Sequence, residues 1–360
     1  MAKIHRLEIG QLRNLDQVQL SPSPQINIFF GDNGSGKTSL LEGIHLLGLG
    51  RSFRSSKTES VIQDGAEICT IYSVLTDGVR VGLSKARRQN QILKLQGDRQ
   101  RNWVETARHL PLQLINAESF SLLEGGPKIR RRFLDWGVFH VEHAFIGNWR
   151  NTSKCLAHRN LLIKQQRLDK AQLAAWDAEL SDAANQVDVS RRRYFDLFLP
   201  LALETIKELI TIEGLNLQYW RGWEESISLD DALKLSLDKD VRYGATQVGP
   251  HRADMFVRIG RRAAAEILSR GQQKLLVSAL KIAQGRLLAS HSGVQGIYLV
   301  DDLPSELDRY NRTLVCELLV NLGSQVFLTS VDSADLGNSW VSSALPRKFH
   351  VEHGKIEPVD

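Results

Sequence analysis

The eight residues "GDNGSGKT" at positions 31–38 constrain the fold of this chain more than any other feature. They match the phosphate-binding-loop pattern G-x-x-x-x-G-K-[ST] in full, and a chance match in a chain of this length is expected on the order of one per cent of the time. The apolar run "INIFFG" (26–31) leads into the loop, and "SLLEGIHLLGLG" (39–50) follows with apolar residues at helical spacing. This order of strand, loop and helix is the context that the motif requires. We therefore expect an α/β domain with a buried strand here.

The residue types in this loop suit the binding of a nucleotide triphosphate. Gly31, Gly34 and Gly36 allow backbone N–H groups to approach phosphate oxygens with no Cβ in the way. The following helix presents its positive N-terminus to the same anion. Lys37 is expected to reach the β- and γ-phosphates, and the Thr38 hydroxyl to ligate Mg²⁺. The loop thus predicts ATP and Mg²⁺ as cofactors.

A second magnesium partner is expected at the end of a neighbouring strand. The run "IYLVDD" (297–302) has four strand-type residues followed by Asp301 and Asp302. We expect Asp301 to hold the magnesium ion, through water. Asp302 is expected near the γ-phosphate, where a carboxylate orients or deprotonates the attacking water. Lys37 and Asp302 are therefore the candidate catalytic residues.

The overall composition predicts a soluble protein of the cytoplasm. The chain has 42% hydrophobic and 24% charged residues, which is ordinary for a globular protein. Its start lacks an apolar signal segment, and no run approaches the roughly 20 apolar residues of a membrane span. The three cysteines are scattered and odd in number, which favours a reducing compartment over a disulfide framework. No membrane partner is expected.

Basic residues are clustered along the chain, whose net charge is +5. For any single cluster, a solvated protein surface is an adequate explanation, whereas five clusters together are consistent with a polyanionic partner such as DNA. The clusters are Arg87-Arg88, Arg99 with Arg101, Lys128 with Arg130-Arg131-Arg132, Arg191-Arg192-Arg193, and Arg258 with Arg261-Arg262.

The middle of the chain differs in character from the two ends. Residues 65–115 have a β-rich pattern, whereas residues 130–210 have few glycines or prolines and strong helical periodicity. Two heptad series predict a short helical hairpin with a coiled-coil-like seam and a break near 167–170, although an ordinary helical bundle explains them equally well. The first series is Trp149, Leu156 and Ile163; the second is Leu173, Leu180, Val187 and Tyr194, joined by Trp176, Ala183 and Leu197.

Two further segments indicate which class of ATPase the P-loop and the acidic strand belong to. "ILSRGQQK" (267–274) resembles the LSGGQ signature of ABC-type ATPases, with Arg270 in place of one glycine. "SELD" (305–308) resembles the D-loop that follows the acidic strand in these proteins. We therefore expect a P-loop ABC-type ATPase head, a mixed sheet with helices, formed by residues 1–125 and 245–360. Residues 126–244 are expected to be an inserted, mainly helical lobe that contains the hairpin.

Five separated segments, which span nearly the whole chain, together resemble the RecF family of bacterial recombination mediators, relatives of the SMC heads. They are "LRNLDQVQL" (12–20), "NGSGKTSLLEGIHLLGLGRSFRS" (33–55), "LLEGGPKIRRRFLDW" (122–136), "GPHRADM" (249–255) and "LVDDLPSELD" (299–308).

The resemblance implies an ATP-dependent DNA-binding protein with weak, DNA-stimulated ATPase activity. Such a protein acts in recombinational repair, replication restart and the SOS response. It binds single-stranded gaps and their duplex junctions, and helps RecO and RecR to load RecA. The alternative is a generic SMC-like or ABC-like head in another DNA-associated assembly. A nuclease of the ATPase-plus-acidic-domain kind would need a further carboxylate cluster on a domain of its own, and this class is not expected because only a few residues follow the last expected strand.

The resemblance also implies an ATP-dependent two-fold dimer with two equivalent sites. Ser269, Gly271 and Gln272 of one subunit would complete the site that contains Lys37 of the other. The remaining residues implied to bind the nucleotide are Arg13, Asn14, Gly31, Asp32, Asn33, Gly34, Ser35, Gly36, Thr38 and Ser39.

The sequence departs from the expected pattern at three points. Ala117 stands where the family usually has proline before Glu118. The strand "SQVFLTS" (324–330) ends in Thr329-Ser330, with no histidine where transporters carry their switch residue. Asp302 is shorter than the catalytic glutamate of the wider ABC class. The last two features predict slow hydrolysis.

Some residues have two interpretations on sequence alone. Arg130–Arg132 could contact DNA or support the structure, Arg191–Arg193 are by default an exposed helix face, and His251 and Arg252 could line a site or pack. "FHVEH" occurs at 139–143 and again at 349–353, but it lacks the i, i+4 histidine pair of a zinc protease. We interpret the repeat as a coincidence.

Overall fold

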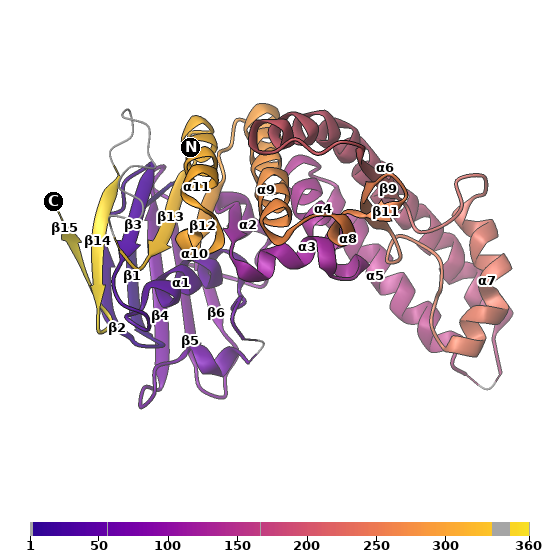
Figure 1. Ribbon diagram of the computed structural model, residues 1–360. Coiled ribbons are helices and arrows are strands. Elements are labelled where there is room, and N and C mark those ends of the chain that lie inside the picture. The colour runs from indigo at the N-terminus through magenta and orange to yellow at the C-terminus, as the bar shows by residue number, and fades with distance from the viewer. Residues whose placement is uncertain (1–2, 56, 166, 333–345, 360) are drawn as a thin grey trace. The chain divides into compact units, whose positions relative to one another are not determined.

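The computed structural model describes residues 3–55, 57–165, 167–332 and 346–359 (Figure 1). The chain forms two compact units: unit 1 is Met1–Phe120 with Lys274–Asp360, and unit 2 is Ser121–Gln273. Residues 245–273, which the sequence pattern grouped with the ATPase lobe, belong to unit 2 because strand β10 (Asp254–Ile259) pairs with strand β9 (Leu215–Trp220). In the described parts of the chain, no helix has both the length and the apolar character needed to cross a bilayer.

In the part of unit 1 that the structure describes, the strands form two six-stranded sheets, and Figure 1 labels most of these strands. The antiparallel sheet has the order β2-β1-β4-β5-β6-β7, from β1 Ile4–Leu12, β2 Leu15–Leu20, β4 Ile68–Leu75, β5 Arg80–Ala86, β6 Ile92–Leu95 and β7 Asp98–Gln100. The mixed sheet has the order β15-β14-β3-β13-β12-β8, from β3 Ile26–Phe30, β8 Leu112–Ile115, β12 Ile297–Val300, β13 Gln325–Ser330, β14 Arg347–Glu352 and β15 Lys355–Val359. Among the described residues, the helices that lie wholly in unit 1 are α1 Lys37–Leu49, α2 Val104–His109, α10 Leu303–Glu306 and α11 Arg309–Asn321, with 3₁₀ turns η1 Thr58–Val61 and η2 Ala117–Phe120.

The strands predicted around the P-loop are confirmed. β3 is apolar and almost wholly buried, as expected of a strand inside a parallel sheet with both faces covered. It pairs in parallel with β13, which pairs in parallel with β12, and β12 in turn pairs in parallel with β8. The carboxyl ends of these four strands therefore meet at one edge, where ligands bind in open α/β sheets.

Helix α1 packs against both sheets of unit 1, and two of its glycines allow the close approach. A Cβ at Gly43 would come within 2.9 Å of Ile9 Cδ1 on β1, and a Cβ at Gly48 within 2.4 Å of Leu112 Cδ1 on β8. The helix ends at Gly50, whose left-handed backbone favours glycine. This packing fixes the helix that follows the P-loop relative to both sheets.

Unit 2 combines helices with a small antiparallel sheet of order β11-β10-β9. Its remaining elements are α3 Ser121–Glu124, α4 Pro127–Val141, α5 Phe145–Leu162, α6 Lys170–Leu209, α7 Leu229–Tyr243, α8 Ala264–Ile267 and β11 Arg262–Ala263. Helix α9 (Arg270–Ser292) begins in unit 2 and continues into unit 1.

The predicted helical hairpin is confirmed as α5 and α6, with the break at 163–169. Asp169 caps α6 by accepting hydrogen bonds from the amides of Ala171 and Gln172. All four members of the second heptad series, from Leu173 to Tyr194, are buried. The predicted seam is wrong at two of its positions: Trp149 is 42% exposed and Leu197 is 41% exposed, because each lies on the solvent side of a helix whose neighbouring turns are buried.

Candidate functional site

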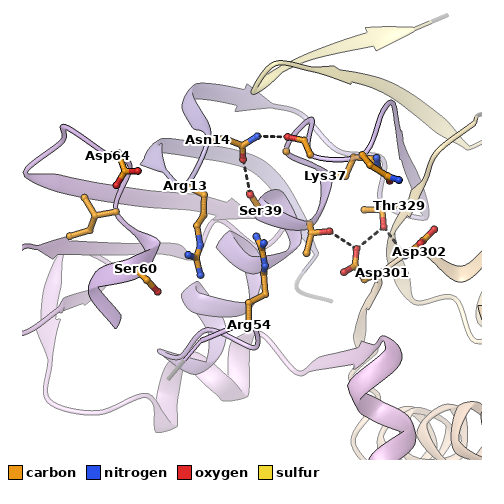
Figure 2. A pocket seen from close by; sticks show the side chains of 15 residues that line it. Arg13, Asn14, Lys37, Ser39, Arg54, Ser60, Asp64, Asp301, Asp302 and Thr329 are labelled. Carbon is orange, nitrogen blue, oxygen red and sulfur yellow. Dashed lines mark hydrogen bonds between the residues drawn. The ribbon is translucent and has the colours of Figure 1, made fainter. Parts of the chain in front are cut away.

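A polar cavity of about 500 Å³ in unit 1 brings together residues from distant parts of the sequence (Figure 2). Most of the predicted nucleotide-binding residues of unit 1 line it, together with Arg54, Ser60, Ile62, Asp64 and Thr329. The predicted residues among its lining are Arg13, Asn14, Asn33, Gly34, Gly36, Lys37, Thr38, Ser39, Asp301 and Asp302. Gly31, Asp32 and Ser35 belong to the same loop but are not part of the lining.

The loop backbone requires glycine at two points. Gly31 has a φ of 147°, and a Cβ there would lie 2.1 Å from the Val351 carbonyl oxygen on β14. Gly36 has a φ of 126°, and a Cβ there would lie 2.8 Å from Leu15 Cδ2. The turn after β14 also contacts the loop, since the Gly354 amide donates to the Ser35 carbonyl at 2.8 Å. The loop is therefore held by β2 and by the C-terminal hairpin of unit 1.

The Lys37 side chain folds back over its own loop and is only 8% exposed. Its Nζ donates hydrogen bonds to the carbonyl oxygens of Gly31, at 2.5 Å, and Asp32, at 2.8 Å. Burial lowers the pKa of Lys37, whereas the negative charges of Asp302, Asp301 and Asp32 oppose that shift. Both hydrogen-bond acceptors are neutral carbonyls, which phosphate oxygens can replace with a stronger, charge-assisted partner.

Thr38 and Asp301 meet although 263 positions separate them (Figure 2). Thr38 Oγ1 donates to Asp301 Oδ1 at 3.1 Å, and Thr329 Oγ1 donates to the same oxygen at 2.8 Å. Burial raises the pKa of Asp301, and the two hydroxyl hydrogen bonds oppose the shift. A hydroxyl beside a carboxylate at a phosphate-binding loop is the oxygen pair that Mg²⁺ prefers.

Arg13 and Asn14 act on the loop and its helix through their own contacts. Asn14 Nδ2 donates to the Gly34 carbonyl at 2.9 Å, and its Oδ1 accepts from the Ser39 hydroxyl at 2.8 Å. Arg13 donates to both carboxylate oxygens of Glu42, at 2.8 and 2.9 Å. Asn14 thus links β1 and β2 to the P-loop, while the Arg13 guanidinium neutralises a fully buried acid of α1.

The sequence analysis did not assign Glu42, Arg54 or Thr329 to the site, nor the other lining residues Ser60, Ile62 and Asp64. Glu42 is wholly buried. Its carboxylate forms ion pairs with Arg13 and Arg54 and accepts a hydrogen bond from the Ser52 hydroxyl. Its place inside the apolar run "SLLEGIHLL" was a usable signal, because a buried acid needs a cationic partner. Nothing in the local sequence distinguishes Arg54 from the other arginines, and only the fold places it at the cavity.

The signature residues lie in unit 2, at the start of α9. Ser269 Oγ accepts from the Gln272 amide at 3.3 Å, and Gln272 Oε1 accepts from the Ser269 amide at 3.0 Å. This reciprocal cap is the helix N-terminus expected from the sequence. Arg270 pairs with Glu124 of α3, and both side chains are exposed.

Several arginines of the basic clusters bind acids and carbonyls of unit 2. Arg130 donates to both oxygens of Asp254, at 2.7 and 2.8 Å, and Arg131 donates to the Ala253 carbonyl. Arg191, only 2% exposed, donates to both oxygens of Asp135, at 2.8 and 2.9 Å, and to the Pro250 carbonyl. For Arg191 the expectation of an exposed helix face is wrong, and for Arg130 and Arg131 the structural interpretation holds.

We expect Arg130→Ala to lower the free energy of unfolding by about 2 kcal/mol, because Asp254 would lose its bidentate partner. This expected loss of stability is smaller than that for breaking a fully buried ion pair, because the Arg130 side chain is 15% exposed. Arg132→Ala, an exposed member of the same cluster, is expected to change the free energy of unfolding by less than about 0.5 kcal/mol. Urea denaturation measures both. Equal effects of the two changes would contradict the structural role of Arg130.

The contacts of His251 and Arg252 favour packing within unit 2. His251 is hydrogen-bonded through Nε2 to the Thr246 carbonyl at 2.9 Å, and burial lowers its pKa to about 4. Arg252 donates to Gln247 Oε1 at 3.0 Å. The two copies of "FHVEH" have different structures: the first ends helix α4 and the second lies in β14 and its turn. The two copies therefore share a sequence but not a structure.

The fold is shared with known P-loop heads. A family model described as the RecF/RecN/SMC N-terminal domain matches residues 3–354. A solved structure of the recombination mediator RecF with ATP has a TM-score of 0.85 at 24% identity and covers 99% of each chain. An Smc head bound to the C-terminal winged-helix domain of ScpA has a TM-score of 0.60 at 15% identity, over 99% of this chain and 96% of that one. Fold and motifs define an ATPase head of the RecF/RecN/SMC class, as the sequence predicted.

Relatives with higher sequence identity to this chain indicate one family within this class. The DNA replication and repair protein RecF of Pseudomonas paraeruginosa is 50% identical over 355 residues, which are 98% of this chain and 96% of the relative. RecF of Stutzerimonas stutzeri is 49% identical over 357 residues, again 98% of this chain and 96% of the relative. This chain belongs to the RecF family.

Proposed function

We propose that this chain binds ATP with Mg²⁺ in the cavity of unit 1. The observation that carries the proposal is the contact between Thr38 and Asp301, 3.1 Å apart, beside a lysine folded over a complete phosphate-binding loop. Each group has the chemistry that a magnesium triphosphate needs: N–H groups and a cation for the phosphates, and a hydroxyl and a carboxylate for the metal. The ATP-bound RecF structure of the same fold supports the assignment.

In this proposal each residue of the site has a defined task. The amides at the end of the loop and the start of α1, together with the Lys37 ammonium, would hold the β- and γ-phosphates. Thr38 and Asp301 would hold Mg²⁺, which would neutralise the phosphate charge. Asp302 orients or deprotonates the attacking water. Arg54, which lines the cavity and forms an ion pair with Glu42, adds a positive charge near the phosphates. The short Asp302 side chain and the Thr329-Ser330 end of β13 favour weak ATPase activity.

ATP is proposed to stabilise a two-fold dimer. Ser269, Gly271 and Gln272 of one subunit would face the nucleotide held by Lys37 of the other, so that each dimer has two equivalent sites. Ser269, Gly271 and Gln272 lie at the N-terminus of α9, and the positive end of the helix dipole there supports this role as an anion site. Nucleotide that bridges two subunits shifts the monomer–dimer equilibrium by mass action.

The proposed biological task is recombinational repair and replication restart in the cytoplasm. The protein would bind single-stranded gaps and their duplex junctions, and with RecO and RecR it would help to load RecA, which also supports the SOS response. Support comes from the DNA replication and repair proteins that are half identical to this chain. Further support comes from the solved RecF structures, which are described as part of the RecFOR pathway.

A gel-shift titration of gapped duplex DNA, with and without ATP, tests this function. We expect ATP to tighten DNA binding, because the dimer offers two copies of each DNA contact. Binding should also weaken steeply as salt rises, since phosphate contacts release counterions. An absence of DNA binding at low salt under both conditions would rule out the proposed function and leave a generic SMC-like head. Intact duplex of the same sequence is the matched control for gap recognition.

A further inference from the structure

Helix α10 begins directly after Asp302 and contacts it through a serine. We propose that Ser305 and Lys274 are positioning residues for Asp302: Ser305 orients its carboxylate, and Lys274 holds the helix that carries Ser305. The inference rests on the proposed ATPase function. It extends that function by identifying the residues through which the signature helix α9 would affect the carboxylate that acts on the attacking water.

Ser305 is placed to set the orientation of Asp302. Its Oγ lies 2.6 Å from Asp302 Oδ2, and its amide donates to the Asp302 carbonyl at 3.1 Å. Asp302 has a left-handed backbone, with φ 52° and ψ 47°, which is uncommon for residues other than glycine. The Asp302 amide is also bound, by Thr329 Oγ1 at 2.8 Å. One carboxylate oxygen is therefore held by α10 while the backbone is held by β13.

Lys274 fixes the position of α10 from the signature helix. Its Nζ lies 2.7 Å from Glu306 Oε2, and the two side chains are only 25% and 17% exposed. The same ammonium lies over the Phe120 ring, 5.7 Å from its centroid. Glu306 follows Ser305 directly and lines a second small cavity with Thr38, Asp301 and Asp302. A displacement of Lys274 therefore acts on α10 one residue from the serine that holds Asp302.

These contacts form a short path from the signature segment to the reacting groups. Lys274 lies five residues after Ser269, about one turn into the continuous helix α9. A partner's nucleotide that engages the start of α9 would shift this helix, and the ion pair would pass the shift to α10 and Ser305. The geometry thus makes the orientation of Asp302 depend on the state of the dimer.

The test combines steady-state ATP hydrolysis with equilibrium binding of a fluorescent ATP analogue to the full chain, in the presence of gapped DNA. We expect Lys274→Ala and Ser305→Ala each to lower kcat about tenfold, within the range for a positioned acid or base. The affinity for the nucleotide should change less than about twofold, since neither residue lines the phosphate-binding cavity. The double variant should be no slower than the slower single, because both act through one carboxylate.

Conservative variants separate positioning from a loss of folding. Lys274→Arg and Ser305→Thr should retain most of the rate, and exchange of the charges in Lys274→Glu/Glu306→Lys should restore more than either single change leaves. Arg108→Ala, which removes an ion pair with Glu105 elsewhere in unit 1, is the matched control. An unchanged kcat in Lys274→Ala, a loss in nucleotide affinity equal to the loss in kcat, or no rescue by Lys274→Arg would each overturn the inference.

Failure of the inference differs from failure of the proposed function. If the wild type and Lys37→Met bind the nucleotide equally well, the ATP site itself is wrong. If the wild type binds and hydrolyses ATP while Lys274→Ala does so at the same rate, only the positioning role is wrong. A wild type that binds ATP without turnover would overturn the positioning role, because Asp302 would then have no reaction to serve.

Discussion

Lys37→Met is expected to weaken ATP binding by at least about 100-fold and to abolish the ATP-dependent dimer. A hydrogen bond to a charged group contributes roughly 1.5–3 kcal/mol, and the lysine is placed to contact two phosphates. Methionine has a similar length and fits a nearly buried site, so the change removes the charge while leaving the packing. The loss of affinity should therefore reflect the phosphate contacts alone.

Binding of a fluorescent ATP analogue and sedimentation with and without ATP measure the two effects. Lys94→Met, an exposed lysine of β6 in the same unit, is the matched control and should behave as the wild type. An unchanged ATP-dependent dimer in Lys37→Met would contradict the arrangement in which nucleotide bridges two subunits. Unchanged binding of the analogue would contradict the site itself.

Ser269→Arg is expected to spare ATP binding by the monomer and to block the ATP-bound dimer. Ser269 lies in unit 2 and does not line the cavity of unit 1, so the cis site keeps all of its contacts. In the dimer a long cation would occupy the space of the partner's phosphates. Overpacking costs about 1–3 kcal/mol per site and each dimer has two sites, so the dimer should weaken by about 30-fold or more.

The control for this change is Ser269→Ala, which removes the cap without adding bulk. It loses the hydrogen bond from the Gln272 amide, worth about 1 kcal/mol of helix stability, and should weaken the dimer less than Ser269→Arg. Sedimentation in saturating ATP compares the two variants with the wild type. A Ser269→Arg protein that dimerises normally would show that the start of α9 does not meet the partner's nucleotide.

Much of the candidate site was predictable because its motifs are local. The glycine pattern of residues 31–38 is imposed by the backbone path of the loop, as the φ values of Gly31 and Gly36 demonstrate. The acidic end of β12 is also a local feature, because an apolar strand followed by two carboxylates can be recognised in the amino-acid sequence. That Thr38 and Asp301 would meet followed from the rule that carboxyl ends of parallel strands share one edge of the sheet, although β13 lies between β3 and β12.

The roles of the arginines were not predictable from the sequence. Arg130, Arg191 and Arg193 stand in similar basic runs, yet Arg191 is buried against Asp135 and the Arg193 side chain is 64% exposed. The partner acid of Arg191 lies 56 positions away on another helix. A charge run shows only where cations are, whereas burial and pairing depend on which acids the fold brings near.

The sequence by itself determined the class of fold, the phosphate-binding loop and the acidic strand, because each depends on interactions among neighbouring residues. Only the tertiary structure decided that Arg13 and Arg54 serve Glu42, that Arg191 is internal, and that Ser305 holds Asp302 while Lys274 holds Glu306. Apart from the local Ser305 contact, these interactions join residues distant in the chain. Their geometry is set by how sheets and helices pack, which no local pattern of residues encodes.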